Sequence, residues 1–83
     1  MNNTISIEFI VTVNNRHVGK FEDVKRAYKS LTNLLKGTYD KIDWNSHLPS
    51  YSKVARDLRQ DIVSQITLPG ILGVATIQKT INS

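Results

Sequence analysis

The chain has 83 residues, of which 40% are hydrophobic and 22% charged, so composition predicts one small globular domain and excludes a disordered chain. It has no cysteine, which excludes disulfides, thiolate metal sites and thiol nucleophiles, and we expect a cytoplasmic protein. The formal net charge of +4 belongs to residues 24–36, because outside this segment seven Lys and Arg balance seven Asp and Glu.

The first predicted element is a strand at residues 4–13. Its odd positions are apolar and most even positions are polar, which predicts one buried face. Asn14 and Asn15 follow, and Asn tolerates the positive φ of tight hairpin turns. We therefore expect residues 17–21 to return as a short antiparallel strand, with Gly19 indicating a bulge or a weak edge.

A helix is predicted to begin after Glu22 and Asp23, because Asp is a preferred N-cap and acids favour the positive end of a helix. A single apolar stripe with helical spacing supports it. Its members are Val24, Ala27, Tyr28, Leu31, Leu34 and Leu35. Gly37 is expected to end this helix in the left-handed conformation.

Residues 38–49 have no periodicity and predict a loop, and a second helix is expected to begin near Ser50. Its apolar positions keep helical spacing as far as Ile66, before Pro69 and Gly70 end it. An alternative pairs residues 61–67 with the last strand as a hairpin about Pro69 and Gly70.

Residues 71–81 predict the last strand, with apolar side chains on both faces as in a central strand or beside a bulge. The prediction is an α+β domain over residues 1–83, in the order β-β-α-α-β. We expect an antiparallel or mixed sheet of about three strands, with both helices packed on one face. The longest nearly apolar run, residues 68–75, is far shorter than the about 20 residues that cross a bilayer, so no membrane contact is expected.

The basic segment is the first candidate site. Lys25, Lys29 and Lys36 share one side of the predicted helix, and Arg26 flanks them. Such a row fits an acidic protein surface or, as the alternative, the phosphates of a nucleic acid. It also fits a solvated face with no partner. The second helix resembles a solvated face, because Lys53, Arg56 and Arg59 are interleaved with Asp57 and Asp61.

The loop supplies the second candidate site. Trp44 is the single tryptophan, and with Tyr39 and His47 it suits an interface anchor. The alternative is that Trp44 closes the small core as a lid over the helix ends. Asp40, Asp43 and His47 also suggest a metal site or a small hydrolase, but loop Asp residues more often cap turns. We therefore expect no metal, no cofactor and no catalysis.

A third candidate concerns assembly. If the odd residues of the first strand face the helices, Ile10 points to the uncovered face of the sheet, where Leu72 and Val74 are expected to join it. These three residues predict a homodimer through the face or an edge of the sheet. The alternative is that they are isolated surface hydrophobes.

Together these patterns predict a non-catalytic binding protein. We expect a stoichiometric regulator or inhibitor, of the size and style that phages and mobile elements encode, which presents its first helix and residues 39–47 to an acidic protein.

Overall fold

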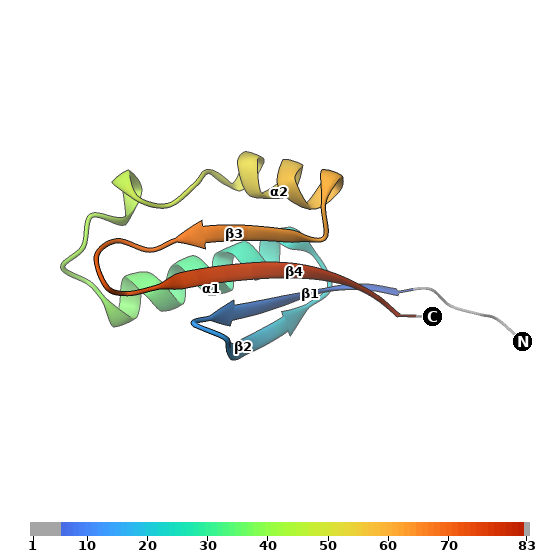
Figure 1. The fold of residues 1–83 in the computed structure, drawn as a ribbon, viewed down its shortest axis with the longest axis horizontal. Coiled ribbons are helices and arrows are strands. Elements are labelled where there is room, and N and C mark those ends of the chain that lie inside the picture. Colours follow the sequence, from blue (N-terminus) through green and yellow to red (C-terminus); the bar gives the residue numbers. More distant parts are fainter. Residues whose placement is uncertain (1–5, 83) are drawn as a thin grey trace, which may run out of the picture.

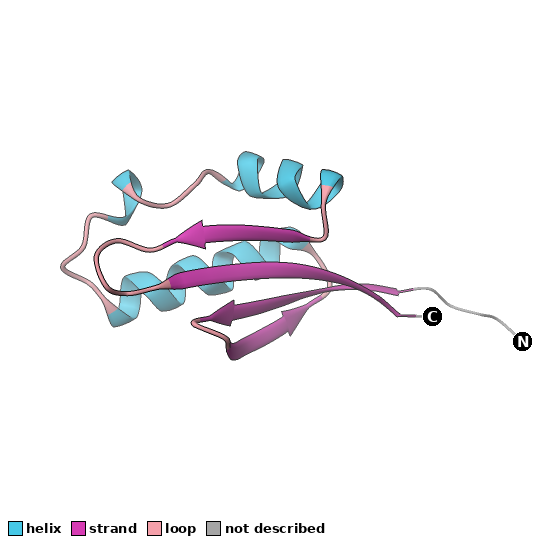
Figure 2. Cartoon of the chain, in the orientation of Figure 1, coloured by secondary structure: helices cyan, strands magenta, loops and turns pink. Residues whose placement is uncertain are grey.

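The computed structural model describes residues 6–82 and has two layers, a four-stranded antiparallel sheet and two helices packed on one face of it (Figure 1). The elements in chain order are β1 (Ser6–Val13), β2 (Arg16–Phe21), α1 (Val24–Thr38), a 3-10 turn η1 (Trp44–Ser46), α2 (Tyr51–Gln60), β3 (Val63–Thr67) and β4 (Val74–Asn82). The strands lie in the order β2-β1-β4-β3, so the two hairpins join through β1 and β4 (Figure 2). The predicted α+β class is confirmed, with one strand more than expected.

The first hairpin forms as its sequence predicts. Asn14 and Asn15 both have positive φ, at 53° and 66°, which matches the twist of a two-residue hairpin turn. Val11 pairs with Gly19 and Thr12 with His17, so Val18 is the extra residue of a bulge beside Gly19. A Cβ on Gly19 would lie 2.9 Å from the Phe21 ring, so glycine leaves room for that ring.

One core holds the two layers together. The odd residues of β1 and β4 face the helices, because Val11 pairs with Ile77 and both are fully buried. The buried hydrophobic residues are Phe9, Val11, Ala27, Leu31, Leu35, Trp44, Val54, Leu58, Ile66, Leu68, Ala75 and Ile77. They come from both helices, three strands and the loops, so the helical layer covers one face of the sheet and leaves the other open.

The predicted start of α1 is confirmed and its predicted end is wrong. The Asp23 carboxylate accepts a hydrogen bond from the Arg26 N–H at 2.8 Å, as an N-cap does. Gly37 does not stop the helix, which continues through Thr38. The Tyr39 N–H donates to the Leu35 carbonyl at 2.9 Å and closes the last turn.

The second helix is shorter than predicted, and the alternative hairpin is confirmed. Ser50 caps α2 as expected, but the helix ends at Gln60, and β3 then pairs with β4 in a single register from Val63 to Thr67. Ser64, Ile66 and Leu68 are buried at every second position, which is the period of a strand. The predicted central position of the last strand is confirmed, because β4 lies between β1 and β3.

Asn14 joins the turns of the two hairpins. Its Nδ2 donates to the Leu72 carbonyl at 2.7 Å, and its Oδ1 accepts from the Val74 N–H at 2.9 Å. Gly73 between them has φ of 98°, and a Cβ there would lie 1.8 Å from the Asn14 Oδ1. Glycine is therefore required at position 73 both by backbone conformation and by contact with the first hairpin.

Candidate functional site

The cations of α1 point away from the core. Lys25, Lys29 and Lys36 are exposed, whereas Ala27, Leu31 and Leu35 on the opposite side are buried. Within residues 6–82, no ion pair involves these three lysines. Arg26 differs, because its Nε lies 3.5 Å from the Asp23 carboxylate that caps the helix. The predicted row therefore exists, and its unpaired members are the lysines.

Lys36 lies in a different environment from Lys25 and Lys29. It lines a shallow pocket of about 290 Å³ together with Asp40, Asp43 and Trp44, in the loop after α1. Two carboxylates beside one ammonium group reduce the local positive potential. Glu22 and Asp23 precede the other end of α1, so Lys29 is the cation of this helix that lies farthest from acids in the sequence.

The aromatic loop closes the core. Trp44 is 3% exposed, and its Nε1–H donates to the Tyr39 carbonyl at 2.9 Å. The Tyr39 ring packs against the indole with ring centroids 6.3 Å apart, and Tyr39 is itself half-buried. Trp44 is therefore the lid over the end of α1, and of the loop residues considered for binding, His47 is exposed.

The Asp43 carboxylate stabilises the 3-10 turn of the loop. The Asp43 Oδ2 accepts a hydrogen bond from the Ser46 hydroxyl at 2.8 Å, which braces the 3-10 turn. Over residues 6–82, no group of three or more Asp, Glu, His or Cys side chains is arranged to hold a metal ion. Asp40, Asp43 and His47 are therefore not brought together as the metal interpretation requires.

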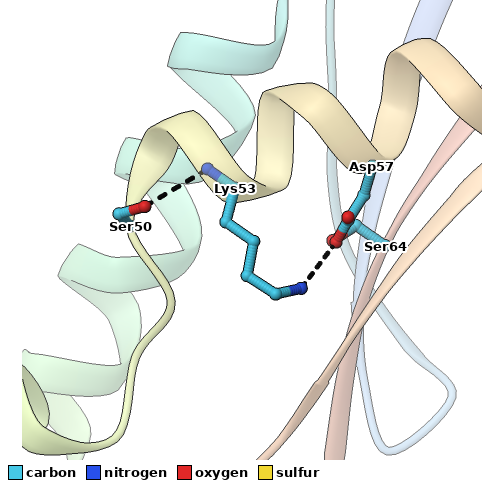
Figure 3. A network of polar contacts seen from close by, with 4 residues as sticks. All are labelled: Ser50, Lys53, Asp57 and Ser64. Carbon is cyan, nitrogen blue, oxygen red and sulfur yellow. Dashed lines mark hydrogen bonds and ion pairs between the residues drawn. The ribbon is translucent and has the colours of Figure 1, made fainter.

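Asp57 is the acidic residue of α2, and its side chain points to β3. The Asp57 carboxylate accepts hydrogen bonds from the Lys53 ammonium at 2.9 Å and from the buried Ser64 hydroxyl at 3.1 Å (Figure 3). The hydrogen bond from Lys53 lowers the pKa of Asp57 most, with further lowering by Ser64 and by the charges of Lys53 and Arg56, while desolvation opposes them. Asp57 thus joins α2 to β3 and neutralises Lys53.

The remaining cations of α2 are a feature that the sequence pattern concealed. Asp61 is outside the helix, where its carboxylate accepts from the Ile62 N–H, and Asp57 faces β3. Arg56 and Arg59 are exposed and take part in no ion pair within residues 6–82. The pairing expected from the charge pattern is present between Lys53 and Asp57, but Asp61 is outside the helix, so α2 carries more cations than acids.

The two helices form one basic layer. Together they hold seven of the eleven Lys and Arg residues and one of the seven acids. Tyr28 joins them, because its hydroxyl donates to the Pro49 carbonyl at 2.7 Å and its ring meets the Tyr51 ring edge-on at 5.7 Å. We call the exposed cations Lys25, Arg26, Lys29, Arg56 and Arg59 the helical basic surface.

The three residues considered for assembly do not share one face. The register places Ile10 and Val74 on the open face of the sheet, where both are half-buried. Leu72 is in the loop before β4 and packs against the core. The expected position of Leu72 is therefore corrected, because the turn around Gly70 and Gly73 directs this side chain inward.

Neither described helix has the length and apolar character needed to cross a bilayer. Comparison with protein-family models, with curated proteins and with solved structures gave no match to this chain.

Proposed function

We propose that this chain is a non-catalytic binding protein, a stoichiometric regulator or inhibitor, whose helical basic surface engages an acidic surface of a partner protein. The observation that supports this most is a difference in pairing. Lys20, Arg26 and Lys53 each lie beside a carboxylate, whereas Lys25 and Lys29 are exposed and form no ion pair within residues 6–82. Unpaired cations gathered on one face steer and orient an anionic partner.

Exposed apolar side chains on the same layer favour a protein as the partner. Leu34 of α1 is 42% exposed and Tyr51 of α2 is 40% exposed. Tyr51 is held by the Tyr28 ring, so little conformational entropy is lost when it is buried by a partner. Tyr and Arg are enriched in protein interfaces, so an exposed tyrosine in the same layer as Arg56 and Arg59 favours a protein partner.

A nucleic acid is the alternative partner for the same cations. Many single-strand binding modules stack bases on aromatic side chains of an open sheet. Here none of the six aromatic residues lies on the open face, since Phe9 and Phe21 pair on the helix side of the sheet and the other four are in the helices and the loop. Binding to nucleic acid would rest on the charge alone.

The proposal includes a cytoplasmic location, for which the absence of cysteine is the support. It also includes the view that phages or mobile elements encode small regulators of this kind, which rests on size alone.

The test is a pull-down from host extract treated with nuclease, comparing the wild type with Lys25→Glu/Lys29→Glu. The matched control is Arg16→Glu/Lys20→Glu, which changes the net charge equally at exposed positions of β2, outside both helices and the loop. We expect one specific protein to be recovered by the wild type and the control and lost by the helix variant. Equal recovery by both variants would contradict the proposal.

A nucleic-acid partner would give a different result. Recovery would disappear on nuclease treatment, and duplex binding by the purified chain would weaken with salt, with a log-log slope of about −0.9 for each phosphate neutralised. That outcome would replace the protein partner with a nucleic acid at the same surface.

A further inference from the structure

The two edges of the sheet differ in how they are protected. The β2 edge carries a bulge at Val18 and the cations Arg16 and Lys20. Bulges and charged side chains are the devices by which natural sheets prevent an edge from pairing with another chain. The β3 edge has neither, because residues 63–67 have no ionisable side chain and keep one register with β4.

The hydrogen bonds at the two ends of β3 determine which of its backbone groups point away from β4. The Leu68 N–H donates to the Gly73 carbonyl at 2.8 Å, and the Lys79 N–H donates to the Ile62 carbonyl at 2.6 Å. Hydrogen-bonded pairs alternate along an antiparallel ladder, so Ser64 and Ile66 bond to β4 as well. The N–H and C=O groups of Val63, Gln65 and Thr67 therefore point outward.

These outward groups make no hydrogen bond within the described chain, although α2 packs against β3 and runs alongside it (Figure 1). Over residues 6–82, no loop, helix or side chain makes a hydrogen bond to the backbone of Val63, Gln65 or Thr67. Beside them, Ile62 is 56% exposed and Val63 is 37% exposed. The edge thus combines three unpaired backbone positions with exposed apolar side chains, which is the form of a strand that accepts another strand.

The identity of the added strand follows from symmetry and charge. The free positions are centred on Gln65, so a two-fold axis at this residue pairs Val63 with Thr67 and Gln65 with Gln65 of a second copy. Every outward group then finds a partner. Self-pairing of β2 would place cations opposite cations, whereas β3 is uncharged and the Lys53–Asp57 pair next to it is neutral.

We propose that β3 pairs antiparallel with β3 of a second copy of this chain, which gives a closed two-fold dimer with a continuous eight-stranded sheet. Directly opposed residues in an antiparallel pair point to the same face, so both helical layers lie on one side of the dimer. The inference is independent of the proposed function, and it would present two helical basic surfaces in one direction.

The experiment is the molar mass of the purified full chain by sedimentation equilibrium at concentrations from the micromolar to the millimolar range. We expect the wild type to approach twice the chain mass of 9.4 kDa. Gln65→Lys and Gln65→Glu each place like charges opposite each other at the axis and should raise the dissociation constant about fivefold to tenfold. An equimolar mixture of the two variants should dimerise again, because the charges are then opposite.

The control is the same pair of substitutions at His17, which is exposed on the β2 edge and should leave the mass unchanged. Circular dichroism of each variant separates loss of pairing from loss of folding. A wild type that stays monomeric throughout would overturn the proposal. So would a dimer that both Gln65 variants leave intact, for example one that Ile10→Glu on the open face dissociates.

Discussion

The helical layer and the open face of the sheet are both exposed surfaces, but the helices carry an excess of cations, whereas on the open face a cation and an acid are paired. The helices hold seven cations and one acid, and that acid turns toward β3. On the open face, Lys20 lies opposite Ile10 on the neighbouring strand, and its ammonium group is 3.4 Å from the Glu8 carboxylate, among Thr and Gln side chains. The net charge of +4 is therefore a property of one layer, not of a generally basic chain.

The largest expected effect comes from a substitution in the core between the two layers. Leu31 is fully buried between α1 and the sheet, so Leu31→Ala should lower the free energy of unfolding by about 3 kcal/mol. Leu34→Ala on the same helix is the control, because Leu34 is 42% exposed and its loss should cost under about 1 kcal/mol. Urea unfolding measures both, and equal losses would show that α1 does not pack as described.

A smaller effect is expected where the two hairpins join. Gly73→Ala forces a Cβ against the Asn14 side chain at positive φ and should cost about 2–3 kcal/mol. Gly70→Ala has the same kind of backbone strain at φ of 62° but no atom within 4 Å, so about 1 kcal/mol is expected. Thermal unfolding compares them, and a Gly73 variant no worse than the Gly70 variant would remove the Asn14 contact from the account.

Local signals predicted the first half of the fold. Asn14-Asn15, the Asp23 cap and the apolar stripe of α1 each act within a few residues, and each is present in the structure. Residues 61–67 were misjudged because Ile62 and Ile66 continue the helical spacing from Leu58. The strand period was hidden, since the buried position between them is Ser64, whose hydroxyl is satisfied by Asp57.

The candidate site was also predictable only in part, because only some of its features follow from local sequence patterns. The cations of α1 follow from helical spacing alone. Arg56 and Arg59 were missed because Asp61 was counted as a member of the helix. The contacts of Asn14 depend on the tertiary fold, because they join residues about 60 positions apart, which no local pattern reveals.

A substitution of Trp44 distinguishes its two interpretations, a lid over the core and an anchor in an interface. Trp44→Phe keeps most of the buried ring but removes the hydrogen bond to the Tyr39 carbonyl, so stability should fall by about 1–2 kcal/mol. Recovery of the partner in the pull-down should not change, since Trp44 is 3% exposed. A variant with wild-type stability that fails to recover the partner would make the loop part of the binding surface.

The smallest expected effect concerns Asp57. Its pKa is lowered in the folded chain, so its contribution to stability is present above the ordinary value of 3.8 and is lost as the pH falls through the lower folded value. Asp57→Asn should remove this part of the acid dependence. Thermal melts from neutral to acidic pH measure it, and an identical slope in the variant would mean that the Lys53 and Ser64 contacts do not stabilise the carboxylate.

The most direct test of the helical basic surface is an amide chemical-shift titration of the full chain with polyglutamate at low salt. We expect shifts around Lys25, Lys29 and Arg56, little change on the open face around Ile10 and Thr76, and reversal as salt rises. Shifts spread evenly over both faces, or centred on the sheet, would contradict the claim that one layer of this molecule is built to meet an anionic partner.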